Sequence, residues 1–245
     1  MKKIGIICEG ERDKDMIMAT IDHFLNEDIH YLLIQPEPIF GADNGAGWKG
    51  VIRWCQKYSG MLYDYVNGVT PPIDLLIIQM DADVARSEKE IFCYNVITNC
   101  QGQGTEDPLN CSIAKEGLCS QILPPNSVCS GEPEDRVRYL RTVLNHYLDT
   151  DQRVNYIVTI PCDATDTWIL AAFEDEYCDV EKIKYPWGII AKRKDYHGIR
   201  IPGKKKAKKT YGLLIERVCE KWDVVKEKCP QALQFENEIR NHIYL

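Results

Sequence analysis

Apolar positions in the first 84 residues follow two periods in alternation. Short apolar runs at residues 4–8 and 31–35 are typical of strands, whereas residues 11–25 and 51–65 repeat apolar side chains at helical spacing. Residues 75–80, "LLIIQM", are apolar except for one glutamine. A strand with one face in water would alternate, so this run predicts a strand that is buried on both faces. The order strand, helix, strand, helix, strand favours a parallel sheet with right-handed crossovers.

The rest of the chain resumes this pattern after an irregular segment. Residues 85–131 are rich in Gly, Pro, Asn and Ser, and we expect them to form an insertion. A helix is predicted over residues 133–148, a fourth strand over residues 156–161, and another helix after Thr165, which we expect to cap it. Residues 192–245 are expected to form a basic loop and C-terminal helices. We therefore expect one α/β domain over residues 1–245, with a mostly parallel central sheet, a cysteine-rich insertion and a helical tail.

Acidic residues follow the predicted strands. Glu9 comes after the first strand, Asp81 and Asp83 come after the third, and Asp166 lies in the first turn of the helix after the fourth. Residues two apart on a strand point the same way, so Asp81 and Asp83 repel each other unless a cation lies between them. The carboxyl ends of parallel strands meet at the edge where ligands bind. The sequence therefore predicts a divalent metal site there. The alternative is that Asp81 and Asp83 only cap the next helix.

Charge is unevenly spread along the chain. The net charge is −7, but residues 192–209 contain nine Lys or Arg and one Asp, which gives this segment +8 and leaves −15 on the remainder. Such a segment predicts either a phosphate-binding strip or a solvated loop. The candidate nucleic-acid-binding residues are Lys192, Arg193, Lys194, Arg200, Lys204, Lys205 and Lys206.

The cysteines and the apolar runs indicate the compartment. The sequence has eleven cysteines. They form no Cys-x-x-Cys pair, although Cys93, Cys100, Cys111, Cys119 and Cys129 lie in the expected insertion. Free thiols in a reducing compartment are the simpler interpretation, and a zinc site is the alternative. No apolar run is long enough to span a membrane, and the one after Lys3 is too short for a signal peptide. We expect a cytoplasmic protein without a membrane partner.

Three segments carry a resemblance to a known family. "IICEGERD" followed by "LLIIQMDADV" resembles the TOPRIM catalytic core, in which a Glu-Gly follows the first strand and an Asp-x-Asp a later one. "IPCDATDTWILAAF" and the tail "KKTYGLLIERVCEKWDVVKEKCPQALQFENEI" resemble small stand-alone TOPRIM-like proteins related to the OLD-family nucleases. The resemblance covers residues 1–84 and 155–245, and it leaves the insertion unmatched. The third acidic residue is more often Glu in those proteins, whereas here it is Asp166.

This resemblance implies hydrolysis of phosphodiester bonds in DNA or RNA, supported by Mg²⁺ or Mn²⁺. Glu9 would act as general base or metal ligand, Asp81 and Asp83 would bind the metal, and Asp166 would complete a second metal site. Lys208 or Lys209 would neutralise charge on the phosphate. Relatives of this kind often belong to anti-phage systems, and the sequence leaves open whether an ATPase partner is required.

Other classes of protein agree less well with the sequence. A haloacid-dehalogenase phosphatase carries Asp-x-Asp at its first strand, where this chain has Cys8 and Glu9. A nucleotide-sugar transferase would not require Glu9-Gly10, and the Gly-rich residues 41–50 lack the ending of a P-loop. A cysteine nucleophile has no local signature. A non-catalytic sensor or interaction module that binds metal on the same fold stays the main alternative.

Overall fold

The computed structural model describes residues 1–37, 45–86, 132–148, 153–203 and 205–244. Its centre is a sheet of four parallel strands in the order β2-β1-β3-β4. The strands are β1 (Lys2–Ile7), β2 (Ile29–Gln35), β3 (Leu75–Gln79) and β4 (Tyr156–Thr159). Ile4 lies opposite Leu75, and Leu76 lies opposite Tyr156. The α/β class with a parallel central sheet is thus confirmed.

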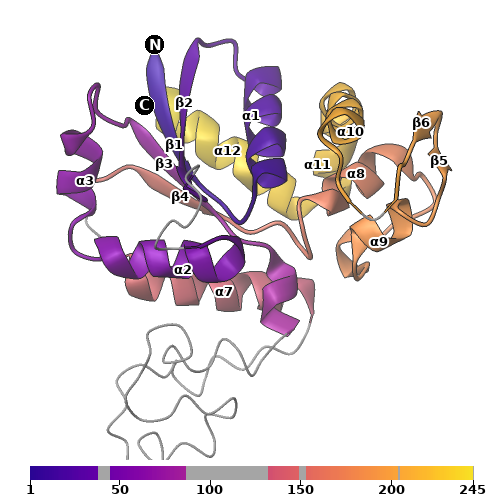
Figure 1. Ribbon diagram of the computed structural model, residues 1–245, viewed down its shortest axis with the longest axis horizontal. Helices are drawn as coiled ribbons and strands as arrows, with labels where there is room; N and C mark the ends of the chain where they lie inside the picture. The colour runs from indigo at the N-terminus through magenta and orange to yellow at the C-terminus, as the bar shows by residue number, and fades with distance from the viewer. Residues whose placement is uncertain (38–44, 87–131, 149–152, 204, 245) are drawn as a thin grey trace, which may run out of the picture.

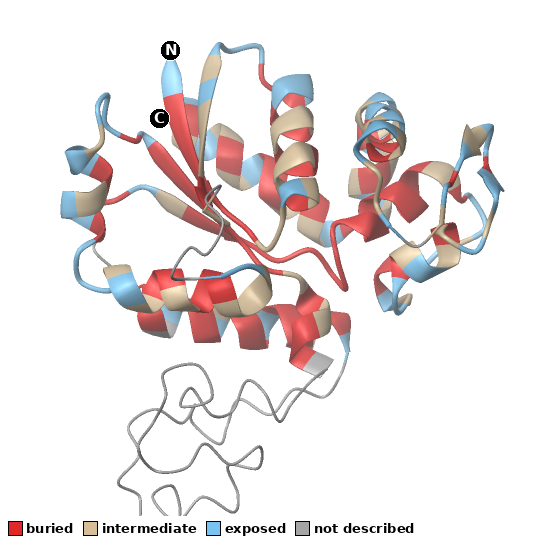
Figure 2. Cartoon of the chain, viewed as in Figure 1, coloured by how far each residue is buried: buried red, intermediate tan, exposed pale blue. Residues whose placement is uncertain are grey.

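Helices cover both faces of this sheet (Figure 1). Helices α1 (Glu11–Phe24) and α12 (Pro230–Tyr244) pack on one face, and α2 (Gly47–Tyr58) and α7 (Pro133–Tyr147) pack on the other. Strands β1 and β3 are buried between these layers, whereas β2, at the edge of the sheet, is only partly buried (Figure 2). Along β3, Leu75 and Ile77 enter the first core while Leu76 and Ile78 enter the second. The prediction of a strand buried on both faces is therefore confirmed.

The single helical pattern expected over residues 51–65 belongs to two helices. Helix α2 ends at Tyr58, and α3 runs from Leu62 to Gly68. Gly60, between them, has φ +68°, a left-handed conformation that ends helices and that glycine adopts without a steric penalty. The apolar rhythm continues across the break because Tyr65 on α3 packs against Trp54 and Tyr58 on α2.

The C-terminal part is helical, as expected. Helices α8 (Asp166–Phe173), α9 (Pro186–Ile190), α10 (Lys208–Glu220) and α11 (Trp222–Lys228) lie to one side of the sheet in Figure 1, and α12 returns to pack on its face. Short 3₁₀ segments lie at Ala82–Arg86 and Val180–Lys182. The expected basic loop contains a short antiparallel hairpin of β5 (Asp195–Tyr196) and β6 (Ile199–Arg200). His197 and Gly198 turn the chain with positive φ, a combination that two-residue hairpins prefer.

Part of the expected insertion lies outside the described residues. Residues 87–131, with Cys93, Cys100, Cys111, Cys119 and Cys129, belong to this part, so the interpretations of these cysteines stay predictions. Cysteines elsewhere in the described ranges are free thiols. In the described part of the chain, none of the helices is both long and apolar enough to cross a membrane.

Candidate active site

Glu9 and Asp81 meet at the carboxyl end of the sheet. Glu9 follows β1 and Asp81 follows β3, and these strands are hydrogen-bonded neighbours. Glu9 Oε1 accepts a hydrogen bond of 2.8 Å from the backbone N–H of Asp81. Gln79 braces the pair, since its Oε1 accepts from the N–H of Glu9 at 3.2 Å and its Nε2 donates to Asp81 Oδ1 at 2.7 Å. The crossover after β1 runs to β2 on one side, and the crossover after β3 runs to β4 on the other, so these acids stand at the switch point where open α/β sheets bind ligands.

Asp13 joins this pair, although it is not among the acids that follow predicted strands. It lies on the buried face of α1, in the same stripe as Ile17 and Ile21. Its Oδ1 accepts a hydrogen bond of 2.7 Å from the hydroxyl of Thr165. Thr165 precedes α8 and Asp166 lies in its first turn, as predicted, but the Thr165 hydroxyl makes no capping hydrogen bond, because it is directed to Asp13. An acid at an apolar position of a helical stripe was the signal for Asp13.

Burial and mutual repulsion dominate the electrostatics of these acids. Burial, together with the charges of Asp13 and Asp83, raises the pKa of Glu9 to about 8, although the N–H groups of Asp81 and Trp48 oppose the shift. Burial and the charges of Asp13, Glu9 and Asp83 raise the pKa of Asp81 well above its ordinary value. A group of carboxylates with raised pKa values is a place where an added cation would be strongly attracted.

Asp83 lies in the 3₁₀ turn after β3, and its backbone is fixed by the neighbouring loop. Its N–H donates to the carbonyl of Asp163 at 2.9 Å. The charge of Asp83 acts on both Glu9 and Asp81. The structure therefore brings Glu9, Asp81 and Asp83 into one electrostatic group. Asp81 Oδ1 accepts a hydrogen bond from the Gln79 side-chain amide, whereas in the helix-capping alternative it would accept one from a backbone N–H.

Asp166 enters the same group through a lysine. It is the first residue of α8, it is buried, and its charge contributes to the raised pKa of Asp13, for which burial is the main cause. Lys206 Nζ lies 2.6 Å from Asp166 Oδ2. The lysine that reaches the acids is thus Lys206, whereas Lys208 and Lys209 are exposed in the first turn of α10.

Of the other basic residues in the strip at 192–209, some pair with acids of the fold and others are exposed to solvent. Arg193 pairs with Glu174 at 2.6 Å, so part of its charge is used within the fold. Lys204 lies outside the described residues. The exposed residues of the strip are Lys192, Lys194, Arg200, Lys205, Lys208 and Lys209.

The donor set is suitable for Mg²⁺ or Mn²⁺, but the side chains are not arranged around an ion. Carboxylate oxygens are the ligands that these hard cations prefer. Within the described ranges, no group of three His, Cys, Asp or Glu residues stands close enough to hold a metal ion. Glu9 and Asp81 instead turn oxygens toward protein donors. One oxygen of each carboxylate is thus engaged by the protein.

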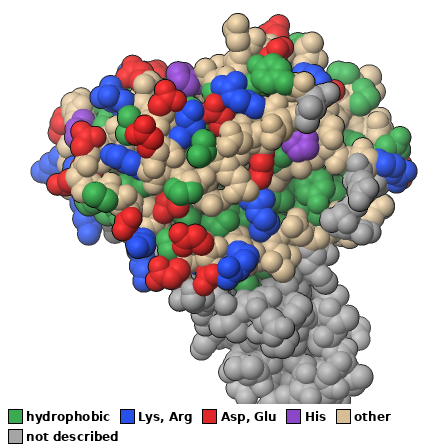
Figure 3. Space-filling model, turned by 180° about the vertical axis from the view of Figure 1, so that it is seen from behind, with side chains coloured by type: hydrophobic (Ala, Val, Ile, Leu, Met, Phe, Trp, Pro, Cys, Tyr) green, Lys and Arg blue, Asp and Glu red, His purple; other side chains and the backbone are tan. Residues whose placement is uncertain are grey.

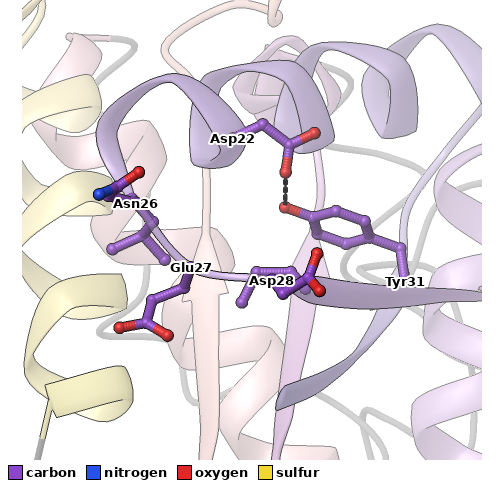
Figure 4. A pocket seen from close by; sticks show the side chains of 7 residues that line it. Asp22, Asn26, Glu27, Asp28 and Tyr31 are labelled. Atoms are coloured by element: carbon purple, nitrogen blue, oxygen red, sulfur yellow. Dashed lines mark hydrogen bonds between the residues drawn. The ribbon is translucent and has the colours of Figure 1, made fainter. Parts of the chain in front are cut away.

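Two concave regions of the surface lie away from the site of Glu9 and Asp81. One is lined by Asp22, Asn26, Glu27, Asp28 and Tyr31 at the amino end of β2, where the Tyr31 hydroxyl donates to Asp22 at 2.6 Å (Figure 4). The other lies between α8, the β5–β6 hairpin and α10. The face turned away in Figure 1 carries acidic and basic side chains interspersed (Figure 3). None of these features gathers the residues that the sequence indicated.

Comparison of the chain with models of protein families, with curated proteins and with solved structures finds no significant match.

Proposed function

We propose that the chain is a divalent-metal-dependent nuclease on a TOPRIM-like fold, acting on phosphodiester bonds in DNA or RNA. The observation that carries the proposal is the contact between Glu9 and Asp81 at the switch point of the parallel sheet, with Asp13 and Asp83 in electrostatic range. The resemblance of the same residues to the TOPRIM core supports it.

The residues of the site have complementary roles in this proposal. Asp81, Asp83 and Asp13 would hold Mg²⁺ or Mn²⁺, which when bound polarises a phosphate oxygen and acidifies a water molecule. Glu9, whose pKa is about 8, is near the range in which a carboxylate accepts a proton efficiently at neutral pH. The Lys206 ammonium would face the negative charge that grows on the phosphate.

Nucleic acid is the proposed partner because exposed residues of the basic strip adjoin Lys206 along the chain. Lys205, Lys208 and Lys209 flank this lysine in sequence and are exposed. Phosphate contacts of this type supply affinity without selecting a base sequence. The proposal thus covers both DNA and RNA, with or without an ATPase partner.

One observation favours a second candidate, a non-catalytic sensor or interaction module. The carboxylates of Glu9 and Asp81 are engaged by protein donors, and the described acids do not form a ready metal-binding group. In such a module, the site would bind a metal ion or a partner without catalysing a reaction, and binding would act as the signal.

A cleavage panel separates the two candidates. Purified chain is incubated with single- and double-stranded DNA and RNA in Mg²⁺, Mn²⁺ or EDTA, and the products are resolved by size. The nuclease predicts cleavage of at least one substrate that EDTA abolishes. A chain that binds Mn²⁺ in calorimetry and cleaves none of the substrates would support the module.

A further inference from the structure

Both oxygens of Asp166 already have partners in the protein. Asp166 is 2% exposed. Its Oδ2 lies 2.6 Å from Lys206 Nζ, and its Oδ1 accepts a hydrogen bond of 3.0 Å from the Tyr211 hydroxyl. A divalent ion that bound Asp166 would have to displace one of these donors from a buried position, where an abandoned donor or charge is costly. The structure thus supplies Asp166 with a cation that belongs to the chain itself.

The Lys206 ammonium is held in place from several sides. It lies 5.8 Å from the centroid of the Trp187 ring and 5.6 Å from that of Tyr211, within the range of cation–π attraction. The following residue, Ala207, precedes α10 and accepts the Tyr211 N–H at 2.9 Å. Lys206 is therefore positioned by the start of a helix, by two aromatic rings and by a carboxylate.

The carboxylate that holds this ammonium is next to the acids of the proposed metal site. Thr165, the residue before Asp166, donates its hydroxyl to Asp13 Oδ1 at 2.7 Å. In agreement with this geometry, the charge of Lys206 opposes the rise in the pKa of Asp13 and of Asp81. In two-metal sites, the two ions stabilise the attacking and the leaving oxygens of the displacement. An ammonium group beside the acids would supply the positive charge of one of these ions.

We propose that Lys206, anchored by Asp166 and Tyr211, takes the place of a second metal ion, so that the site binds a single divalent cation through Asp13, Asp81 and Asp83. This inference rests on the proposed function, and it makes Asp166, which the family resemblance would make a metal ligand, a positioning residue for Lys206. The substrate phosphate would then bridge one metal ion and one ammonium group.

Mn²⁺ titration of the full chain, followed by calorimetry and by the electron paramagnetic resonance signal of free Mn²⁺, tests the inference without nucleic acid. We expect one ion per chain for the parent and for Asp166→Asn, and none for Asp81→Asn. We expect Lys206→Met to bind Mn²⁺ at least about threefold more tightly, because a positive charge that repels the ion is gone. Lys206→Arg, which keeps the charge, and Lys205→Met, on an exposed neighbour, should match the parent. Melting curves of each variant identify any that fail to fold, and Lys206→Gln, which also removes the charge, serves as the replacement if Lys206→Met does.

Two results would overturn the inference. Two ions per chain in the parent, with one lost in Asp166→Asn, would make Asp166 a metal ligand and would leave the proposed nuclease standing. Weaker binding in Lys206→Met would mean that the ammonium does not compete with the ion. A parent that binds no Mn²⁺ would instead refute the metal dependence on which the proposed function itself depends.

Discussion

At the scale of single residues, the surroundings of Asp81 disfavour its ionised form. Its carboxylate is half-buried, accepts a hydrogen bond from Gln79 and lies within the electric fields of Glu9, Asp13 and Asp83. Because these neighbours and burial disfavour the ionised form, the charge on Asp81 destabilises the metal-free fold. A side chain with these surroundings is better explained by ligand binding than by stability.

Asp81→Asn should therefore raise the melting temperature of the metal-free protein at pH 7. Asparagine keeps the acceptor for Gln79 and removes the repelled charge, and each kcal/mol gained corresponds to about 2–4 °C in a chain of this size. Differential scanning calorimetry in EDTA measures the shift, with the exposed Asp28→Asn as control. A lower melting temperature for Asp81→Asn would show that the fold requires this carboxylate.

The raised pKa of Glu9 predicts how the stability of the metal-free protein changes with pH. Its pKa is raised from 4.5 to about 8 in the folded protein, so the folded state holds a proton that the unfolded state has released. This contribution is fully present below pH 4.5 and is lost as the pH rises toward 8. We expect the metal-free melting temperature to decline over this window, and Glu9→Gln to flatten the decline. An identical slope in the parent and in Glu9→Gln would contradict the assignment.

Single residues also show which parts of the site the sequence could predict. Glu9 and Asp81 could be predicted because each follows a strand, and parallel strands end at one edge. Asp13 carried a weaker signal, an acid within an apolar stripe. Lys206 could not be selected, because nine basic residues lie in one segment and only the packing of α10 decides which reaches Asp166.

At the scale of elements, a buried ion pair connects α7 to the loop that ends β4. Arg136 Nη1 lies 3.0 Å from Asp163 Oδ1, and the two side chains are 2% and 1% exposed. Asp163 has φ +64°, and its Oδ2 accepts the N–H of Tyr185 at 2.7 Å. Since the Asp163 carbonyl also accepts the N–H of Asp83, this pair positions the backbone of the acidic site.

Arg136→Met should lower the free energy of unfolding by about 3–5 kcal/mol, because it leaves the Asp163 charge buried without its partner. Urea unfolding measures the loss. Arg138→Met, on the same helix but 74% exposed, should change stability by less than about 0.5 kcal/mol. Equal effects of the two substitutions would mean that the buried pair has no special importance.

Helices and strands could be predicted where the apolar pattern fitted only one of the two. The strands and α1 could be predicted, because short apolar runs indicate strands and helical spacing of apolar residues indicates a helix. The division of the pattern at 51–65 into α2 and α3 was not, since Gly60 interrupts the backbone while Tyr65 preserves the apolar rhythm. The hairpin at 195–200 could not be predicted, because the basic residues around it indicated a loop.

At the scale of the whole molecule, the exposed members of the basic strip should supply affinity for nucleic acid. Lys192→Ala combined with Lys194→Ala should weaken binding and reduce the slope of log affinity against log salt by up to about 1.8 on duplex DNA, about 0.9 for each lost contact. Fluorescence anisotropy at several salt concentrations measures both. The control, Lys2→Ala with Lys57→Ala, removes the same charge from exposed residues outside the strip. If the double variant of the strip kept the parental dependence of affinity on salt, the strip would be a solvated segment that does not contact nucleic acid.

The most direct measurement of the central claim is the cleavage rate of Asp81→Asn against that of the parent. Both proteins are compared at saturating Mg²⁺ or Mn²⁺ on whichever DNA or RNA the parent cleaves, after calorimetry has shown that both are folded. The proposed nuclease predicts metal-dependent cleavage by the parent, and a loss of at least about a hundredfold in the variant, because a carboxylate that holds the ion is gone. A folded Asp81→Asn protein that cleaves at the parental rate would contradict the claim.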